Sequence, residues 1–161
     1  MKLLSYGKKI ENLYISINNR IIGSAFSTFE EKIAEGDIVL LVCHSQVWGY
    51  ATVSSKVYFD NTKLWSDKVY PYRARIQDIS IFSKAFTFKE FNVDSIFRDK
   101  LGVGWAFKVL FTPNSIPSEA KSLLEGIISD RSLMNSSKFE EFFSNESKRY
   151  KELQRKKLGL S

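Results

Sequence analysis

Cysteine and histidine are nearly absent from this chain of 161 residues, which has one of each, Cys43 and His44. A single cysteine cannot form an internal disulfide, and one cysteine with one histidine cannot build a zinc site without acidic partners. Adjacent residues of a strand point to opposite faces, so the pair is also poorly placed for Cys–His catalysis. We expect Cys43 to be buried in the core, as free cysteines commonly are.

Long hydrophobic runs and the common nucleotide and metal motifs are also missing. No run of about 18 apolar residues is present to span a bilayer, and the apolar stretch in MKLLSYGKKIENLY is too short for a secretory signal. The patterns GxxxxGK[ST], GxGxxG, CxxC and HExxH do not occur. We therefore expect a soluble, cytoplasmic protein with no membrane partner, no metal and no cofactor.

The net charge of +6 is concentrated in two places. The segment 148–158 has six cations and one acid, which leaves residues 1–147 with a net charge of +1. Between Lys63 and Arg75, four cations accompany a single acid, Asp67. Because a local cluster attracts phosphates whatever the overall charge, the second segment is the better candidate for a binding surface.

The pattern of apolar residues favours strands in the first two thirds of the chain and helices at the end. We predict helices over 27–34, with a capping box at Ser27 and Glu30, and over 117–129 and 139–158. We predict strands over 13–17, 38–43, 47–53, 56–60, 72–77 and 103–111. This order predicts an α+β domain over residues 1–130, built on a small curled sheet of five to six strands. Residues 131–161 would form a helical extension whose basic end could connect to a further domain.

An unusual group of aromatic residues lies beside the second cationic cluster. Rings of this kind stack on single-stranded or extruded bases, worth about 1–3 kcal/mol per base, while cations neutralise phosphates. Alternation over 72–77 places Arg73 and Arg75 on an outer face, opposite Tyr72. An equally consistent interpretation is structural: Trp65 anchors the core and the two arginines are ordinary exposed strand residues. The rings and cations concerned are Trp48, Trp65, Tyr70 and Tyr72, with Lys63, Lys68, Arg73 and Arg75.

The order of motifs over about residues 13–130 resembles the EVE domain family. The most specific part is Tyr58-Phe59-Asp60, followed by Trp65 and then Tyr70-Pro71-Tyr72-Arg73. Weaker parts are Ile22-Gly23, the Gly36-Asp37 turn before IVLLV, the strand WGYATV and the helix opened by IPSEAKSLLEGI. EVE domains belong to the PUA-like superfamily, together with YTH and ASCH domains. The resemblance implies a curled, mixed PUA-like sheet or barrel flanked by helices.

The same resemblance implies a pocket for an extruded, modified base. Ile22, Gly23 and Ser24 would form one wall. Relatives often have tryptophan at the position of Ile22, and isoleucine offers contact area without an aromatic face. The rings of the pocket would be Trp48, Trp65 and Tyr70, and the contacts to the nucleic-acid backbone would be Lys63, Lys68, Tyr72, Arg73 and Arg75.

These observations predict a non-catalytic module that recognises modified DNA by base flipping. By resemblance, its partners would be a GTPase motor and a nuclease subunit, as in McrBC-type modification-dependent restriction systems. RNA binding is an alternative, because the superfamily is rich in RNA binders. A small nuclease that uses Asp60 or Asp67, and a structural adaptor for a motor protein, are further alternatives.

Overall fold

A computed structural model describes residues 1–103 and 114–159 of the chain. The strand predicted over 103–111 lies outside the described residues, apart from Val103. The described helices are α1 (Ile10–Asn19), α2 (Phe29–Lys32), α3 (Val93–Leu101), α5 (Ser118–Ser129) and α6 (Phe139–Lys157), with 3-10 turns η1 (Phe88–Phe91) and η2 (Ser136–Lys138). The strands are β1 (Lys2–Ser5), β2 (Ile21–Ser24), β3 (Ile38–Cys43), β4 (Gln46–Val53), β5 (Tyr58–Phe59), β6 (Tyr72–Thr87) and β7 (Asn114–Ser115).

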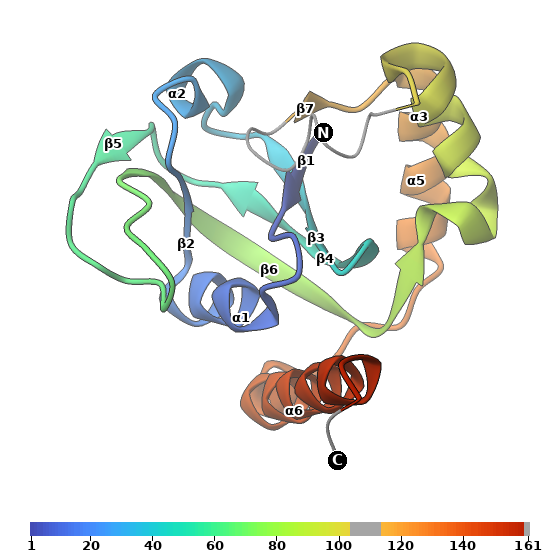
Figure 1. Ribbon diagram of the computed structural model, residues 1–161. Helices are drawn as coiled ribbons and strands as arrows, with labels where there is room; N and C mark the ends of the chain where they lie inside the picture. Colours follow the sequence, from blue (N-terminus) through green and yellow to red (C-terminus); the bar gives the residue numbers. More distant parts are fainter. Residues whose placement is uncertain (104–113, 160–161) are drawn as a thin grey trace.

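The strands form one mixed sheet in the order β2-β6-β4-β3-β1-β7, with β5 paired to β6 as well (Figure 1). β1 and β3 run parallel, whereas the other pairs are antiparallel. Five strands have four residues or more, and β5 and β7 have two each. The prediction of an α+β fold with a curled, mixed sheet is confirmed.

The sheet curls along the long strand β6. Its first residues pair with β2 and β5, and its later residues pair with β4. The register between β4 and β6 shifts twice, and such bulges bend and twist a sheet. At Gly49 a Cβ would lie 2.1 Å from the Ser80 carbonyl oxygen, so only glycine allows the two backbones to approach this closely.

Buried side chains fill both faces of the sheet. In β3, Val39, Leu41 and Cys43 belong to a core beneath α1 and α6, whereas Leu40 and Val42 belong to a core beneath α3 and α5. Figure 1 shows these two pairs of helices on different sides of the strands. The predictions that 38–43 is a strand covered on both faces, and that Cys43 is buried, are therefore confirmed.

The strand predicted over 13–17 is wrong, because these residues lie within α1. Ile10, Leu13 and Ile17 recur at helical spacing and are buried in the core. The alternation that suggested a strand came from Ile15, which is only partly buried. The first strand of the chain is instead β1, which pairs with β3 and was not predicted.

The remaining elements follow the sequence pattern to different degrees. Strand β4, at residues 46–53, and helices α5 and α6 confirm their predictions. β5 covers two residues of the strand predicted over 56–60 and pairs with β6. The helix predicted from Ser27 is reduced to the four residues of α2, and its start has no side-chain cap. The capping-box pattern predicted a longer helix than the one that forms. A single helical turn is only marginally stable, and a cap at its start does not extend it.

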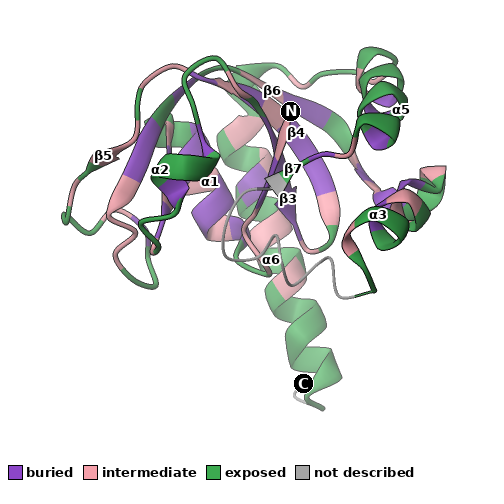
Figure 2. Cartoon of the chain, turned by 90° about the horizontal axis from the view of Figure 1, so that it is seen from above, coloured by how far each residue is buried: buried purple, intermediate pink, exposed green. Residues whose placement is uncertain are grey.

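Helix α6 has a packed first part and an exposed end. Phe139, Phe142, Phe143 and Tyr150 pack against the core beneath α1. Residues 151–159 are all exposed, and Figure 2 shows this end in green as it projects from the body. Over residues 1–103 and 114–159, no helix combines the length and apolar character needed to cross a bilayer.

Candidate functional site

A cavity of about 270 Å³ opens where β2, the start of α1 and the loop of residues 60–71 meet. We call it the Trp65 cavity. Aromatic side chains form much of its wall, and lysines lie at its edge. The residues that line it include Tyr6, Lys8, Lys9, Asn12, Gly23, Ser24, Phe26, Trp65, Lys68 and Tyr70.

Trp65 is held tightly in the wall of this cavity. Only 2% of the residue is exposed, and its indole Nε1–H donates to Ser16 Oγ at 3.1 Å. A Cβ at position 23 would lie 2.5 Å from Trp65 Cη2 and 3.2 Å from Tyr70 Cβ, so Gly23 leaves the space that these two side chains occupy. The Tyr70 ring meets the indole edge to face, with centroids 5.3 Å apart. Trp65 is thus a rigid part of the wall rather than an exposed stacking surface.

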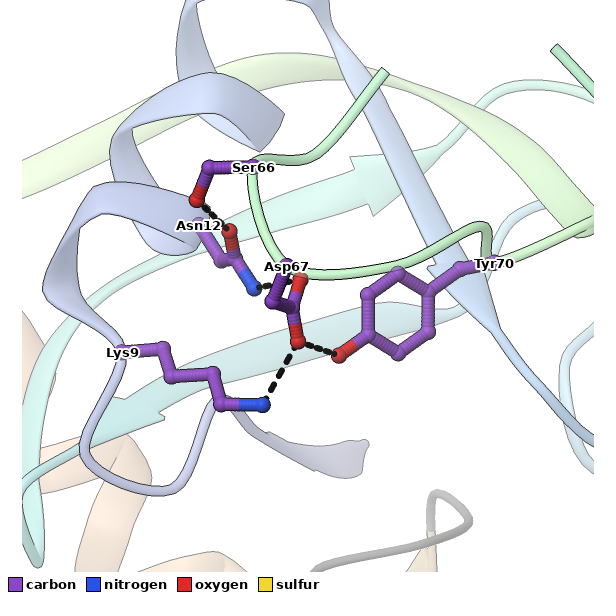
Figure 3. Close-up of polar contacts among 5 residues, drawn as sticks. All are labelled: Lys9, Asn12, Ser66, Asp67 and Tyr70. Carbon is purple, nitrogen blue, oxygen red and sulfur yellow. Dashed lines mark hydrogen bonds and ion pairs between the residues drawn. The ribbon is translucent and has the colours of Figure 1, made fainter. Parts of the chain in front are cut away.

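Polar contacts to Asp67 join α1 to the loop that carries Trp65 (Figure 3). Lys9 Nζ and the Tyr70 hydroxyl donate to Asp67 Oδ2, both at 2.6 Å, and Asn12 Nδ2 donates to Asp67 Oδ1 at 2.8 Å. The Ser66 hydroxyl donates to Asn12 Oδ1 at 3.3 Å. These five residues, the Asp67 network, fix one side of the cavity through four contacts.

The contacts of the network fix the protonation states of Asp67 and Tyr70. Burial alone would raise the pKa of Asp67, but the hydrogen bonds from Lys9, Tyr70 and Asn12 outweigh it and hold that pKa well below its usual range. Burial and the adjacent Asp67 carboxylate raise the pKa of Tyr70 well above its usual range. At neutral pH, Asp67 is therefore ionised and accepts, and the Tyr70 hydroxyl keeps its proton and donates.

This arrangement predicts a loss of stability in acid. Because the pKa of Asp67 is lower in the folded chain than in the unfolded one, its contribution is complete above the unfolded value of about 4 and is lost as the pH falls below it. Asp67→Asn should lower the melting temperature at pH 7 and flatten its decline between pH 5 and pH 2, as measured by circular dichroism. The exposed Asp99→Asn is the matched control. If the melting temperature of Asp67→Asn declined with falling pH in parallel with that of the unchanged chain, this role would be contradicted.

Arg73 corrects the prediction of an outer cationic face. The residue is only 3% exposed, and its Nε donates to the Tyr70 carbonyl at 2.9 Å. Its Nη2 donates to the Thr62 carbonyl, and its Nη1 lies 3.3 Å from Asp60 Oδ2. The guanidinium also lies 5.2 Å from the centre of the Trp65 ring. The start of β6 has β2 on one side and β5 on the other, and the loop of residues 60–71 covers Arg73. Arg73 is therefore a buried residue that stabilises the wall of the Trp65 cavity without lining it.

The structure brings together five of the residues predicted from the sequence and separates the others. Gly23, Ser24, Trp65, Lys68 and Tyr70 line the cavity. The remaining six, Ile22, Trp48, Lys63, Tyr72, Arg73 and Arg75, do not line it.

Two of these six are core residues. Ile22 is fully buried and belongs to the core beneath α1. Trp48 Nε1 donates to the Cys43 carbonyl at 2.8 Å, and its ring packs against Phe142 and Phe143 of α6. Neither side chain is placed to hold a base in the Trp65 cavity.

Three others lie on the β5 side of β6 or in the loop. Tyr72 is partly buried and packs edge to face on Phe59 at 5.5 Å. Arg75 is exposed, with its guanidinium 6.0 Å from the Tyr58 ring, and Lys63 is exposed in the loop. The placement of Arg75 on an outer face is therefore confirmed, whereas that of Arg73 is wrong.

Several lining residues were not found from the sequence, chiefly Tyr6, Lys8, Lys9, Asn12 and Phe26. The first four lie just before α1 or in its first turn, a region that was not recognised as a helix start. The helical spacing of Ile10, Leu13 and Ile17 was the available signal. Phe26 is 46% exposed, which makes it the most accessible ring of the cavity.

Both candidate nuclease acids already have partners. The Asp60 carboxylate contacts Arg73 and accepts from the backbone and hydroxyl of Thr62. Asp67 is the centre of its network. Among the residues that the structure describes, no group of three or more His, Cys, Asp or Glu side chains is arranged as metal ligands. The contacts give Asp60 and Asp67 a structural role in the loop.

Comparison with solved structures identifies the fold. The Mmi1 YTH domain in complex with RNA superposes with a TM-score of 0.55 at 14% identity, covering 80% of this chain and 76% of that one. The fold is that of YTH and ASCH domains. An ASCH protein from Zymomonas mobilis superposes with a TM-score of 0.53 at 12% identity, over 81% of this chain and 95% of that one. A second complex of the mmi1 YTH protein with RNA gives 0.51 at 13% identity, over 79% of each chain.

These likenesses agree with the PUA-like fold that the sequence resemblance implied, at the level of architecture. No family model and no curated protein matches the sequence. The closer resemblance to EVE domains stays a prediction.

Proposed function

We propose that this chain is a nucleic-acid-binding module that takes one base into the Trp65 cavity. The observation that carries the proposal is the combination, in one opening, of an aromatic wall with three exposed lysines at its edge, Lys8, Lys9 and Lys68. Rings provide stacking or edge contacts for a base, and lysines attract the flanking phosphates. The fold is compatible with this role, since two structures of the mmi1 YTH domain, which shares it, are complexes with RNA.

The energetics favour a base that is already unpaired or easily extruded. Taking a base out of a duplex costs about a few kcal/mol, which contacts inside the cavity must offset. Trp65 is too buried to offer a whole face, so Phe26 and Tyr70 provide the accessible ring surface. The volume of about 270 Å³ lies just below the range of about 300–1,000 Å³ for small-molecule pockets, which suits one base rather than a larger ligand.

The first candidate ligand is DNA that carries a modified base, as the resemblance to EVE domains implies. A modification that weakens pairing lowers the cost of extrusion, and added groups on the base gain apolar contact with the rings. The targeting of an McrBC-type GTPase and nuclease is a finer hypothesis that rests on that resemblance alone.

The second candidate is RNA, and one observation favours it. Both YTH structures named above contain RNA, and both share this architecture. Competition between DNA and RNA single strands of identical sequence for the same labelled probe separates the two candidates. A preference of tenfold or more for one of them decides the polymer.

The proposal predicts salt-dependent binding that requires the cavity. Fluorescence anisotropy with methylated and plain duplexes at 50 and 200 mM salt should show weaker binding at the higher concentration, because phosphate contacts release counterions. Trp65→Ala should weaken binding at least tenfold and should abolish the difference in affinity between the methylated and the plain duplex. Trp48→Phe, a change in the core on the α6 side, is the control. Weak, salt-insensitive and equal binding to every probe would refute the proposal.

A further inference from the structure

A second and larger groove, of about 680 Å³, lies between the exposed end of α6, the start of α1 and the turn after β3. We call it the α6 groove. Its basic side chains are Lys8, Lys151 and Lys157, and Tyr150, Leu153 and Leu158 contribute ring and aliphatic surface. Neither the sequence motifs nor the Trp65 cavity accounts for it.

The charge of the α6 groove is positive. Its one carboxylate, Glu11, accepts from the Ser147 hydroxyl at 2.8 Å and pairs with Lys151 at 3.4 Å. Burial would raise the pKa of Glu11, but these contacts outweigh it and lower that pKa, so Glu11 is ionised and already neutralised by a groove lysine. The groove therefore suits a polyanion.

Tyr150, in one wall of the groove, is held by contacts with two neighbouring side chains. The Tyr150 ring stacks on His44 with centroids 3.6 Å apart and planes within 2° of parallel, and Arg149 covers Tyr150 at 4.4 Å. Leu153 and Leu158 are 47% and 66% exposed. A surface that alternates lysines with apolar side chains fits a chain in which charged phosphates alternate with sugars and bases.

Lys8 connects the two openings, because its side chain lines both the Trp65 cavity and the α6 groove. A strand whose base enters the first would have its neighbouring phosphates at Lys8, and Lys151 and Lys157 lie beyond. We infer that the α6 groove binds the backbone of the same nucleic-acid strand whose base occupies the Trp65 cavity. This inference rests on the proposed function and extends it to a defined path for the strand.

The path is tested by comparing a long and a short single strand. Labelled dT15 can reach both openings, whereas dT3 is long enough for the cavity and its edge only. The double variant Lys151→Ala with Lys157→Ala removes two groove cations. The matched control, Lys84→Ala with Lys89→Ala, removes two exposed cations that line neither opening. Circular dichroism verifies that both double variants fold.

Binding is measured by anisotropy between 50 and 200 mM NaCl. For dT15, the groove variant should bind about tenfold more weakly at 50 mM. The slope of log K against log salt should become shallower by about 1.4, because each phosphate that a lysine no longer neutralises on a single strand changes it by about 0.7. For dT3, the groove variant should bind like the unchanged chain. The control variant should match the unchanged chain with both probes, apart from a small uniform effect of net charge.

The possible failures are distinguishable. If Gly23→Ala weakens both probes while the groove variant behaves like the control, the proposed function stands and the path through the α6 groove is refuted. If the unchanged chain binds neither of these probes, nor RNA and methylated DNA strands of the same lengths, both are refuted. If the groove variant keeps its affinity for dT15 but loses affinity for polyglutamate or for vesicles of anionic lipid, the groove serves an acidic protein or a membrane surface, and the inference is overturned.

Discussion

Replacing Gly23 with alanine should weaken nucleic-acid binding by about ten- to a hundredfold and destabilise the fold by about 1–3 kcal/mol, the usual cost of overpacking. The new methyl group would lie 2.5 Å from Trp65 Cη2 and 3.2 Å from Tyr70 Cβ. Trp65 cannot easily retreat, because Ser16 accepts from its indole and the Arg73 guanidinium lies over its ring. The rings must therefore shift toward the cavity, which reduces the space for a base.

Gly126 provides the control for this substitution. It lies in the interior of α5, and a Cβ there would meet nothing within 4 Å. Gly126→Ala should leave binding unchanged and stabilise the helix by up to about 1 kcal/mol. The two variants are compared by anisotropy and urea unfolding. Equal affinity of Gly23→Ala and the unchanged chain would show that the Trp65 cavity does not receive the ligand.

Replacing Arg73 with alanine should produce the largest loss of stability among the cationic residues of this region. We expect a loss of about 2–4 kcal/mol in the free energy of unfolding, because hydrogen bonds from a buried guanidinium to two backbone carbonyls and packing against an indole are removed together. The carbonyls of Thr62 and Tyr70 and the Trp65 ring all belong to the loop that closes the cavity. Binding should weaken as a consequence of the loosened loop.

Arg75→Ala tests whether the loss of stability in Arg73→Ala comes from the buried position of Arg73 or from the removal of one positive charge. Arg75 lies two residues further along β6 but is exposed, and its guanidinium lies 6.0 Å from the centre of the Tyr58 ring. Its removal should change stability by no more than about 0.5 kcal/mol. Urea unfolding of both variants measures the difference. Similar effects of the two substitutions would contradict the distinction between a buried and an exposed arginine.

The sequence predicted the architecture better than its first elements. The continuous apolar run of β3 and the helical spacing in α5 and α6 depend on residues within one segment, and these predictions are confirmed. The segment 13–17 failed because Leu13, Ile15 and Ile17 satisfy a period of two within a short window, although Ile10 extends the helical period. β1 was missed because its four residues do not indicate a strand by themselves, and only their pairing with β3 identifies them as one.

The site was predictable only where its residues are close in sequence. Trp65, Lys68 and Tyr70 lie in one loop, and Gly23 and Ser24 came from the family resemblance. The partners from the start of α1 are more than fifty residues away from Asp67, and only the folded chain joins them.

Arg73 shows a second limit of sequence patterns. Alternation along β6 separates it correctly from Tyr72 and Ala74, but alternation does not say that a loop covers the other face. An arginine between aromatic residues is equally suited to a phosphate and to a buried role beneath a loop. The choice depends on the tertiary contacts of the guanidinium, which link Asp60, Thr62 and Tyr70.

The most direct test of the central claim is a nitrogen-15 NMR titration of the chain with a single-stranded oligonucleotide. If a base enters the Trp65 cavity, the indole N–H of Trp65 and the amides of Gly23 and Ser24 should shift. The indole N–H of Trp48, buried on the α6 side, should stay in place. Saturable binding that leaves the signals of Trp65, Gly23 and Ser24 unchanged would contradict the account.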